Sequence, residues 1–135
     1  MNKFLLFASP RTGSSSLLAT IGSLYRGEQN ISYTHIGEPF GSRNLSKWYG
    51  SILDQLSPEL QELYLQNKNK VTLRRSHVIE ILDICYANSC GIKHLHPHLS
   101  HYNNIRLLEY VMTRGYKIIL LSRKSHILKD ISLEL

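Results

Sequence analysis

Short apolar runs alternate with amphipathic stretches along this chain, and the two patterns predict different elements. Strands are expected at residues 4–8, 31–36, 91–95 and 117–122. The runs at 4–8 and 118–121 are continuously apolar, which is typical of strands buried on both faces of a sheet. Because strands alternate with helices and no linker or internal repeat interrupts them, we expect one domain over residues 1–135, with a parallel α/β sheet flanked by helices.

Helical spacing of apolar residues fills the intervals between these strands. The predicted helices cover about 17–25, 45–56, 58–66, 75–88 and 104–114, with a last one from Ser125. Ser57 is expected to cap the helix that begins at Pro58, a residue favoured at the first helical position. Gly115 is the expected C-terminal stop of the helix at 104–114.

The composition narrows the function classes. The chain has 135 residues with 16 Lys and Arg against 10 Asp and Glu, and the resulting charge of +6 suits an anionic ligand. The basic residues are scattered rather than clustered with aromatics, which disfavours a nucleic-acid partner. No apolar run approaches the roughly 18 residues of a membrane span. Cys85 and Cys90 make neither a disulfide framework nor a zinc set, so we expect a cytoplasmic protein.

The segment Pro10–Ser16 joins the first strand to the first helix and reads Pro-Arg-Thr-Gly-Ser-Ser-Ser. Backbone N–H groups at such a turn, together with the helix N-terminus, favour an anion. Gly13 permits close approach of a ligand, Arg11 offers a permanent charge, and the serines offer hydroxyl donors. The Gly-Lys-Ser/Thr step of an ordinary ATP- or GTP-binding loop is absent. The plainer alternative is a serine-capped helix after a strand.

The segment Phe4–Leu18 resembles the 5′-phosphosulfate-binding loop of sulfotransferases that use 3′-phosphoadenosine 5′-phosphosulfate (PAPS). Lys117–Ser132 is similar to the second motif of that family, in which a strand delivers an Arg and a helix delivers a Ser. The resemblance implies a three-layer, P-loop-like fold with PAPS as sulfuryl donor and no metal. The implied donor-binding residues are Arg11, Thr12, Gly13, Ser14, Ser15, Ser16, Arg123 and Ser132, with Ser125 as the alternative to Ser132.

Two further segments look like bacterial carbohydrate sulfotransferases of the nodulation and trehalose types. Gly37–Phe40 resembles their Glu-Pro-Phe region, and Gly91–Lys93 resembles their Gly-x-Lys strand. The resemblance implies a carbohydrate or similar hydroxyl acceptor and makes Glu38 the candidate general base, with His35 as its rival. Arg11 is then expected to stabilise the leaving phosphate as well as to bind the donor.

Several residues have more than one interpretation. On an extended segment His94, His96 and His98 would share one side, where they could bind a metal, line the acceptor pocket or simply face solvent. Lys93 could face the donor sulfate or extend to solvent from a strand end. Cys85 is expected in the core and Cys90 in a loop.

Sulfotransferases of this kind usually continue into a C-terminal part that covers the donor nucleotide. We therefore expect residues 1–135 to form the N-terminal portion of such a domain, an incomplete sulfotransferase fold. An apolar patch left exposed by the incomplete fold would invite a homodimer or a missing C-terminal partner. Two alternatives remain open. One is a catalytically inactive nucleotide-binding or interaction module of the same fold, and the other is a P-loop nucleotide kinase.

Overall fold

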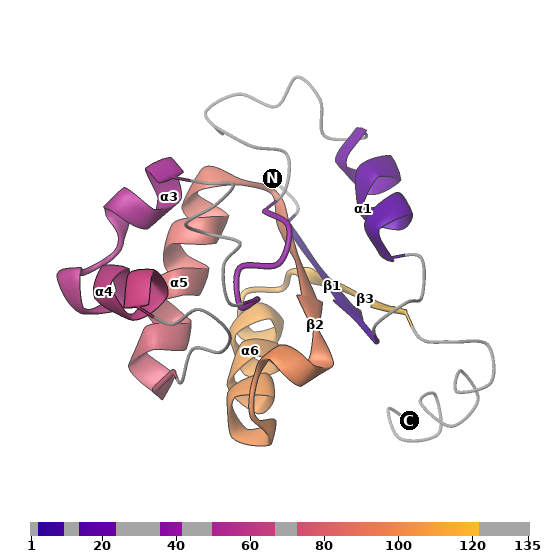
Figure 1. Ribbon diagram of the computed structural model, residues 1–135. Coiled ribbons are helices and arrows are strands. Elements are labelled where there is room, and N and C mark those ends of the chain that lie inside the picture. The colour runs from indigo at the N-terminus through magenta and orange to yellow at the C-terminus, as the bar shows by residue number, and fades with distance from the viewer. Residues whose placement is uncertain (1–2, 10–13, 24–35, 42–49, 67–72, 122–135) are drawn as a thin grey trace.

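Three parallel strands form the centre of the computed structural model, which describes residues 3–9, 14–23, 36–41, 50–66 and 73–121 (Figure 1). The strands are β1 (Phe4–Ala8), β2 (Gly91–Leu95) and β3 (Lys117–Leu121), in the order β2-β1-β3. Leu6 of β1 pairs with Lys93 of β2 and with Ile119 of β3. The expected α/β class, with a parallel sheet flanked by helices, is confirmed. The finer P-loop-like assignment stays a prediction.

A parallel bridge at Ile36 extends the sheet beyond β2. Ile36 pairs with Ile92: its N–H donates to the Gly91 carbonyl at 2.8 Å, and its carbonyl accepts from the Lys93 N–H at 3.3 Å. The order across the sheet is thus Ile36, β2, β1, β3. Of the strand predicted over 31–36, only Ile36 belongs to the described residues.

The helices are α1 (Ser14–Ser23), α3 (Gly50–Gln55), α4 (Pro58–Gln66), α5 (Arg75–Asn88) and α6 (His101–Thr113), with a 3₁₀ turn at His96–His98. The boundaries predicted for α4 and α5 are confirmed. The prediction that α6 begins at Asn104 was wrong, because the Ser100 side chain accepts a hydrogen bond from the Asn103 N–H and caps a helix that begins at His101. Gly115 follows α6 at φ 70°, as expected for a C-terminal stop. Residues 24–25 and 45–49 and the helix predicted from Ser125 lie outside the described residues.

Two hydrophobic clusters cover the two faces of the sheet. Leu5 and Ile92 pack with residues of α3, α4, α5 and α6, whereas Phe4 and Leu6 pack with Leu18 of α1. Figure 1 shows α1 on one side of the strands and α5 with α6 on the other. The expected burial of β1 on both faces is therefore confirmed.

The expectation that the run at 118–121 is fully buried was wrong. Leu120 is 48% exposed, and Ile118, Ile119 and Leu121 are only partly buried. β3 is the outermost strand of the described sheet, with β1 on one side and no described strand on the other. A continuous apolar run reports hydrophobicity, but burial depends on what lies next to the strand.

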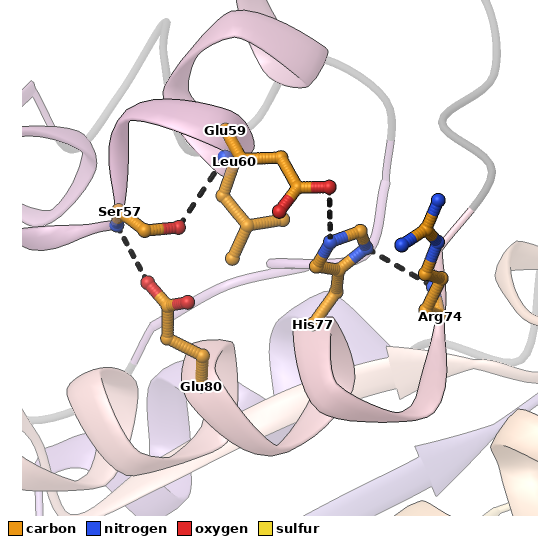
Figure 2. Close-up of polar contacts among 6 residues, drawn as sticks. All are labelled: Ser57, Glu59, Leu60, Arg74, His77 and Glu80. Atoms are coloured by element: carbon orange, nitrogen blue, oxygen red, sulfur yellow. Dashed lines mark hydrogen bonds and ion pairs between the residues drawn. The ribbon is translucent and has the colours of Figure 1, made fainter.

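Hydrogen bonds around Ser57 tie the start of α4 to the side of α5 (Figure 2). The Ser57 side chain accepts from the Leu60 N–H at 3.5 Å, which confirms Ser57 as the N-cap. Its own N–H donates to Glu80 Oε2 of α5 at 2.6 Å. One residue therefore caps α4 and docks it on α5.

A buried histidine makes the second connection between these helices. His77 Nδ1 accepts from the Arg74 N–H at 3.1 Å at the start of α5, and Nε2 lies 3.3 Å from Glu59 Oε1 of α4 (Figure 2). The accepting role of Nδ1 assigns the proton of the neutral ring to Nε2, which faces the carboxylate. The docked α4 and α5 complete the layer against which β2 packs.

Candidate functional site

The chain leaves β1 and β2 toward opposite faces of the sheet. β1 is followed by α1 on one face, and β2 is followed through the turn at His96–His98 by α6 on the other (Figure 1). Adjacent parallel strands whose connections diverge in this way leave a crevice at their carboxyl ends, where ligands of open α/β sheets bind. The candidate site is therefore the edge between Ala8 and Leu95.

Most residues of the predicted donor site fall outside what the structure describes. These are Arg11, Thr12, Gly13, Arg123, Ser125 and Ser132, together with the rival base His35. Ser14, Ser15 and Ser16 form the first turn of α1, so a helix begins shortly after the carboxyl end of β1. Their roles stay predictions.

Glu38 lies beside the carboxyl half of β2 and forms an ion pair with Lys93. Lys93 Nζ is 3.0 Å from Glu38 Oε2, with the Lys93 side chain only 5% exposed and the Glu38 side chain 25% exposed. The Lys93 backbone N–H also donates to the Gly37 carbonyl next to Glu38. Of the two interpretations given for Lys93, extension to solvent is wrong, because the ammonium is buried against a carboxylate.

Two hydrogen bonds and the packing of Phe40 fix the turn that carries Glu38. The Gly41 N–H donates to the Glu38 carbonyl at 3.0 Å, and the Tyr64 hydroxyl donates to the Pro39 carbonyl at 2.7 Å. Phe40 is buried in the core beneath it. The carboxylate thus stands on a fixed turn at the crevice, which is what a positioned acid–base group requires.

His98 approaches the other oxygen of the same carboxylate. Its Nε2 lies 3.9 Å from Glu38 Oε1, and its side chain is 28% exposed. Burial lowers the pKa of His98 below 6.5, the Glu38 carboxylate opposes this shift, and the Lys93 ammonium adds to it. Sequence reasoning missed this pairing with Glu38, although His98 comes soon after the strand that carries Lys93.

His94 is a fully buried, neutral ring whose centroid lies 6.3 Å from that of the His98 ring. Its Nε2 is 2.6 Å from Asn104 Oδ1, while Asn104 Nδ2 donates to the carbonyls of His96 and Leu99. The amide oxygen therefore faces His94, which assigns the ring proton to Nε2. Burial lowers the pKa of His94 to about 4, with the Asn104 hydrogen bond opposing this shift. Asn104 is a second residue that sequence reasoning missed.

A shared side for His94, His96 and His98 required one extended segment, and the structure does not have it. β2 ends at Leu95 and a 3₁₀ turn follows at His96–His98, so the three residues do not alternate along one strand, although the His94 and His98 ring centroids lie 6.3 Å apart. His94 is fully buried with its ring edge-on to Phe7 and Phe40, at 5.3 Å and 5.5 Å between ring centroids, whereas His96 is exposed. Among the described residues, no group of three or more metal-ligating side chains comes together.

Both cysteines are buried free thiols. Cys85 is a buried core residue, as expected, and burial raises the pKa of its thiol. Cys90 is also fully buried, packed with Phe4 and Leu6. The expectation of a loop thiol holds for the position of Cys90 between α5 and β2.

Comparison with known proteins gives no relative. No family model, no curated protein and no solved structure matches this chain. None of the described helices is both long enough and apolar enough to cross a membrane.

Proposed function

We propose that this chain binds PAPS and transfers its sulfuryl group to a hydroxyl of a carbohydrate or similar acceptor. The observation that carries the proposal is the common location of two motif segments far apart in the sequence. The strand that leads into Pro10–Ser16 lies beside the strand that carries Lys93, and Lys93 is paired with Glu38. A donor loop and a candidate base would thus meet at one crevice.

In the proposed reaction the protein mainly positions the reactants and stabilises charge. Arg11 and the backbone amides of Thr12–Ser16 would bind the 5′-phosphosulfate, aided by the partial positive charge at the start of α1. Arg123 and Ser132 would bind the 3′-phosphate of the donor, since a guanidinium and a hydroxyl suit a phosphate. The acceptor oxygen attacks sulfur while the bond from sulfur to the 5′-phosphate oxygen breaks.

Glu38 has the features required of the base in this reaction. One carboxylate oxygen is held by the buried Lys93 ammonium, and the side chain as a whole is 25% exposed. An ionised carboxylate accepts hydrogen bonds and can take the hydroxyl proton as the acceptor attacks. His35 stays the alternative base.

Donor binding is the first test. Calorimetric titration compares 3′,5′-ADP with 5′-AMP for the wild-type chain, for Arg123→Ala and for the control Arg75→Ala, whose side chain is exposed at the start of α5. Loss of one charged phosphate contact costs about 1.5–3 kcal/mol, roughly tenfold to hundredfold in affinity. We expect Arg123→Ala, and not Arg75→Ala, to abolish the preference for 3′,5′-ADP. Absence of any preference in the wild type contradicts the proposal.

Turnover separates the enzyme from its alternatives. Labelled PAPS is incubated with the chain and with glycerol or trehalose as hydroxyl acceptors, and sulfated products are counted. We expect transfer that falls sharply in Glu38→Gln while 3′,5′-ADP binding persists. Donor binding without transfer supports the inactive module, and a preference for ATP supports the nucleotide kinase.

A further inference from the structure

We propose that His98 is a second catalytic residue, which binds the acceptor hydroxyl together with Glu38. This inference rests on the proposed function and adds to it the second contact of the reacting hydroxyl. The two oxygens of the Glu38 carboxylate have different surroundings. Oε2 is 3.0 Å from Lys93 Nζ, and Oε1 faces His98 Nε2.

The separation of these two atoms fits a shared ligand atom. At 3.9 Å, Glu38 Oε1 and His98 Nε2 are too far apart for a direct hydrogen bond. One hydroxyl oxygen can lie about 2.8 Å from both at once, within ordinary hydrogen-bond range. Both side chains are partly exposed, at 25% and 28%, as residues that contact an acceptor need to be.

The protonation state of His98 follows from its surroundings. Its Nδ1 is buried and has no hydrogen-bond partner among the described residues, so a proton on Nδ1 would be buried without an acceptor. Nε2 faces a carboxylate, which only accepts hydrogen bonds when ionised. The neutral ring therefore carries its proton on Nε2.

This arrangement gives each group one role. His98 Nε2–H donates to a lone pair of the acceptor oxygen, and the hydroxyl proton points to Glu38 Oε1. As the new oxygen–sulfur bond forms, the sulfur–oxygen bond of the donor breaks with its electron pair going to the 5′-phosphate, and the hydroxyl proton moves to Oε1. Atoms and charge balance without a further reactant.

At acidic pH, a protonated His98 would pair with Glu38 and so block the proposed hydroxyl site between them, which we call the cradle. Among the described residues, the titratable groups that act on His98 are Glu38, Lys93 and the neutral His94 ring. Burial lowers the pKa of His98 below 6.5, which keeps the ring neutral at pH 7. Once protonated, the imidazolium is attracted to Glu38 and competes with the hydroxyl for Oε1. Transfer is therefore expected to fall as the pH drops through the pKa of His98.

Three variants test the role of His98. His98→Leu removes the donor, His98→Gln keeps an amide donor that does not titrate, and His96→Gln is the control in an exposed histidine of the same turn. With labelled PAPS and glycerol or trehalose, we expect His98→Leu to lose tenfold to hundredfold in transfer rate. His98→Gln should retain most of the rate and lose the acidic limb that His98 contributes to the pH profile. Wild-type rates in His98→Leu overturn the inference.

Nuclear magnetic resonance of labelled histidine tests the cradle without turnover. We expect the neutral His98 ring to carry its proton on Nε2. We also expect its pKa to fall in Glu38→Gln, because the carboxylate that raises it is gone. A proton on Nδ1, or a pKa that Glu38→Gln leaves unchanged, overturns the inference.

The two proposals fail in different ways. If the wild-type chain does not prefer 3′,5′-ADP or transfers no sulfate to either acceptor, the proposed function fails and the catalytic role of His98 falls with it. If the wild type binds and transfers while His98→Leu matches it, only the inference fails. All His98 variants should bind 3′,5′-ADP like the wild type, which shows that they are folded.

Discussion

His94 Nε2 and Asn104 Oδ1 lie 2.6 Å apart and join the carboxyl end of β2 to the first turn of α6. The same amide donates to the carbonyls of His96 and Leu99, so one side chain holds both ends of the segment between the two elements. That segment carries His98 toward Glu38. Asn104 therefore holds the turn that carries His98.

Asn104→Ala is expected to destabilise the fold and to loosen the turn that carries His98. The change leaves the buried His94 N–H and two carbonyls without this partner, and each unsatisfied buried group costs about 1–3 kcal/mol. Urea unfolding at pH 7 measures the loss. Arg106→Ala on the same helix, which removes a partly exposed ion pair with Glu109, is the control and should change stability by less than about 1 kcal/mol. Equal effects would contradict the supporting role of Asn104.

Stability is expected to fall between pH 6.5 and about pH 4 because of His94. The unfolded chain protonates this histidine near its ordinary pKa of 6.5, whereas burial lowers the pKa in the folded state to about 4. The unfolded state thus binds the extra proton first, and stability present above pH 6.5 is lost as the pH falls. The loss is on the order of 3 kcal/mol.

Urea unfolding at several pH values compares the wild type with His94→Gln, which can still donate to Asn104. The variant should show a shallower dependence on pH over this range. An identical slope for the two proteins would show that His94 is not the group responsible.

Removal of Glu38 is expected to cost more stability than removal of Lys93. Glu38→Leu leaves an ammonium that is only 5% exposed without this carboxylate, whereas Lys93→Met keeps the apolar stem and leaves a carboxylate that is 25% exposed. We expect about 3 kcal/mol for the first and about 1 kcal/mol for the second. Chemical denaturation of both variants measures the difference. The reverse order would mean that Lys93 is not desolvated in solution.

Gly91→Ala and Gly115→Ala are expected to destabilise for different reasons. A Cβ at Gly91 would lie 2.2 Å from Cε1 of the buried Phe4 ring, whereas Gly115 has open space and a φ of 70°. Overpacking should cost about 1–3 kcal/mol and the left-handed backbone about 1 kcal/mol. Phe4→Leu, which shortens the side chain, should partly rescue Gly91→Ala and not Gly115→Ala. Thermal unfolding of the single and double variants decides, and rescue of both would contradict the steric explanation.

Local signals in the sequence were enough to predict α4, α5 and β2. Ser57 and Pro58 mark the start of α4, and the apolar period of α5 runs from Val78 to Tyr86, so each element is specified within a few turns. The start of α6 also had a local signal in Ser100, but the polar residues His101–Asn103 carry no apolar period, and the prediction began too late.

The exposure of β3 and the contacts of Glu38 depended on tertiary structure. The apolar run at 118–121 is the same whether its strand is central or outermost, so only the order β2-β1-β3 decides that Leu120 is 48% exposed. The resemblance to sulfotransferases made Glu38 a candidate base before the structure was considered. For Lys93, the residue type alone predicted a positive charge.

Their pairing, and the approach of His98, require the segment after Ile36 to lie beside β2 and the chain to turn at Pro97. The sequence by itself thus determined the elements and the candidate chemistry, because helix caps and apolar periods act over short spans. Which side chains meet was decided by the crossing connections of the sheet, which bring distant segments to one edge.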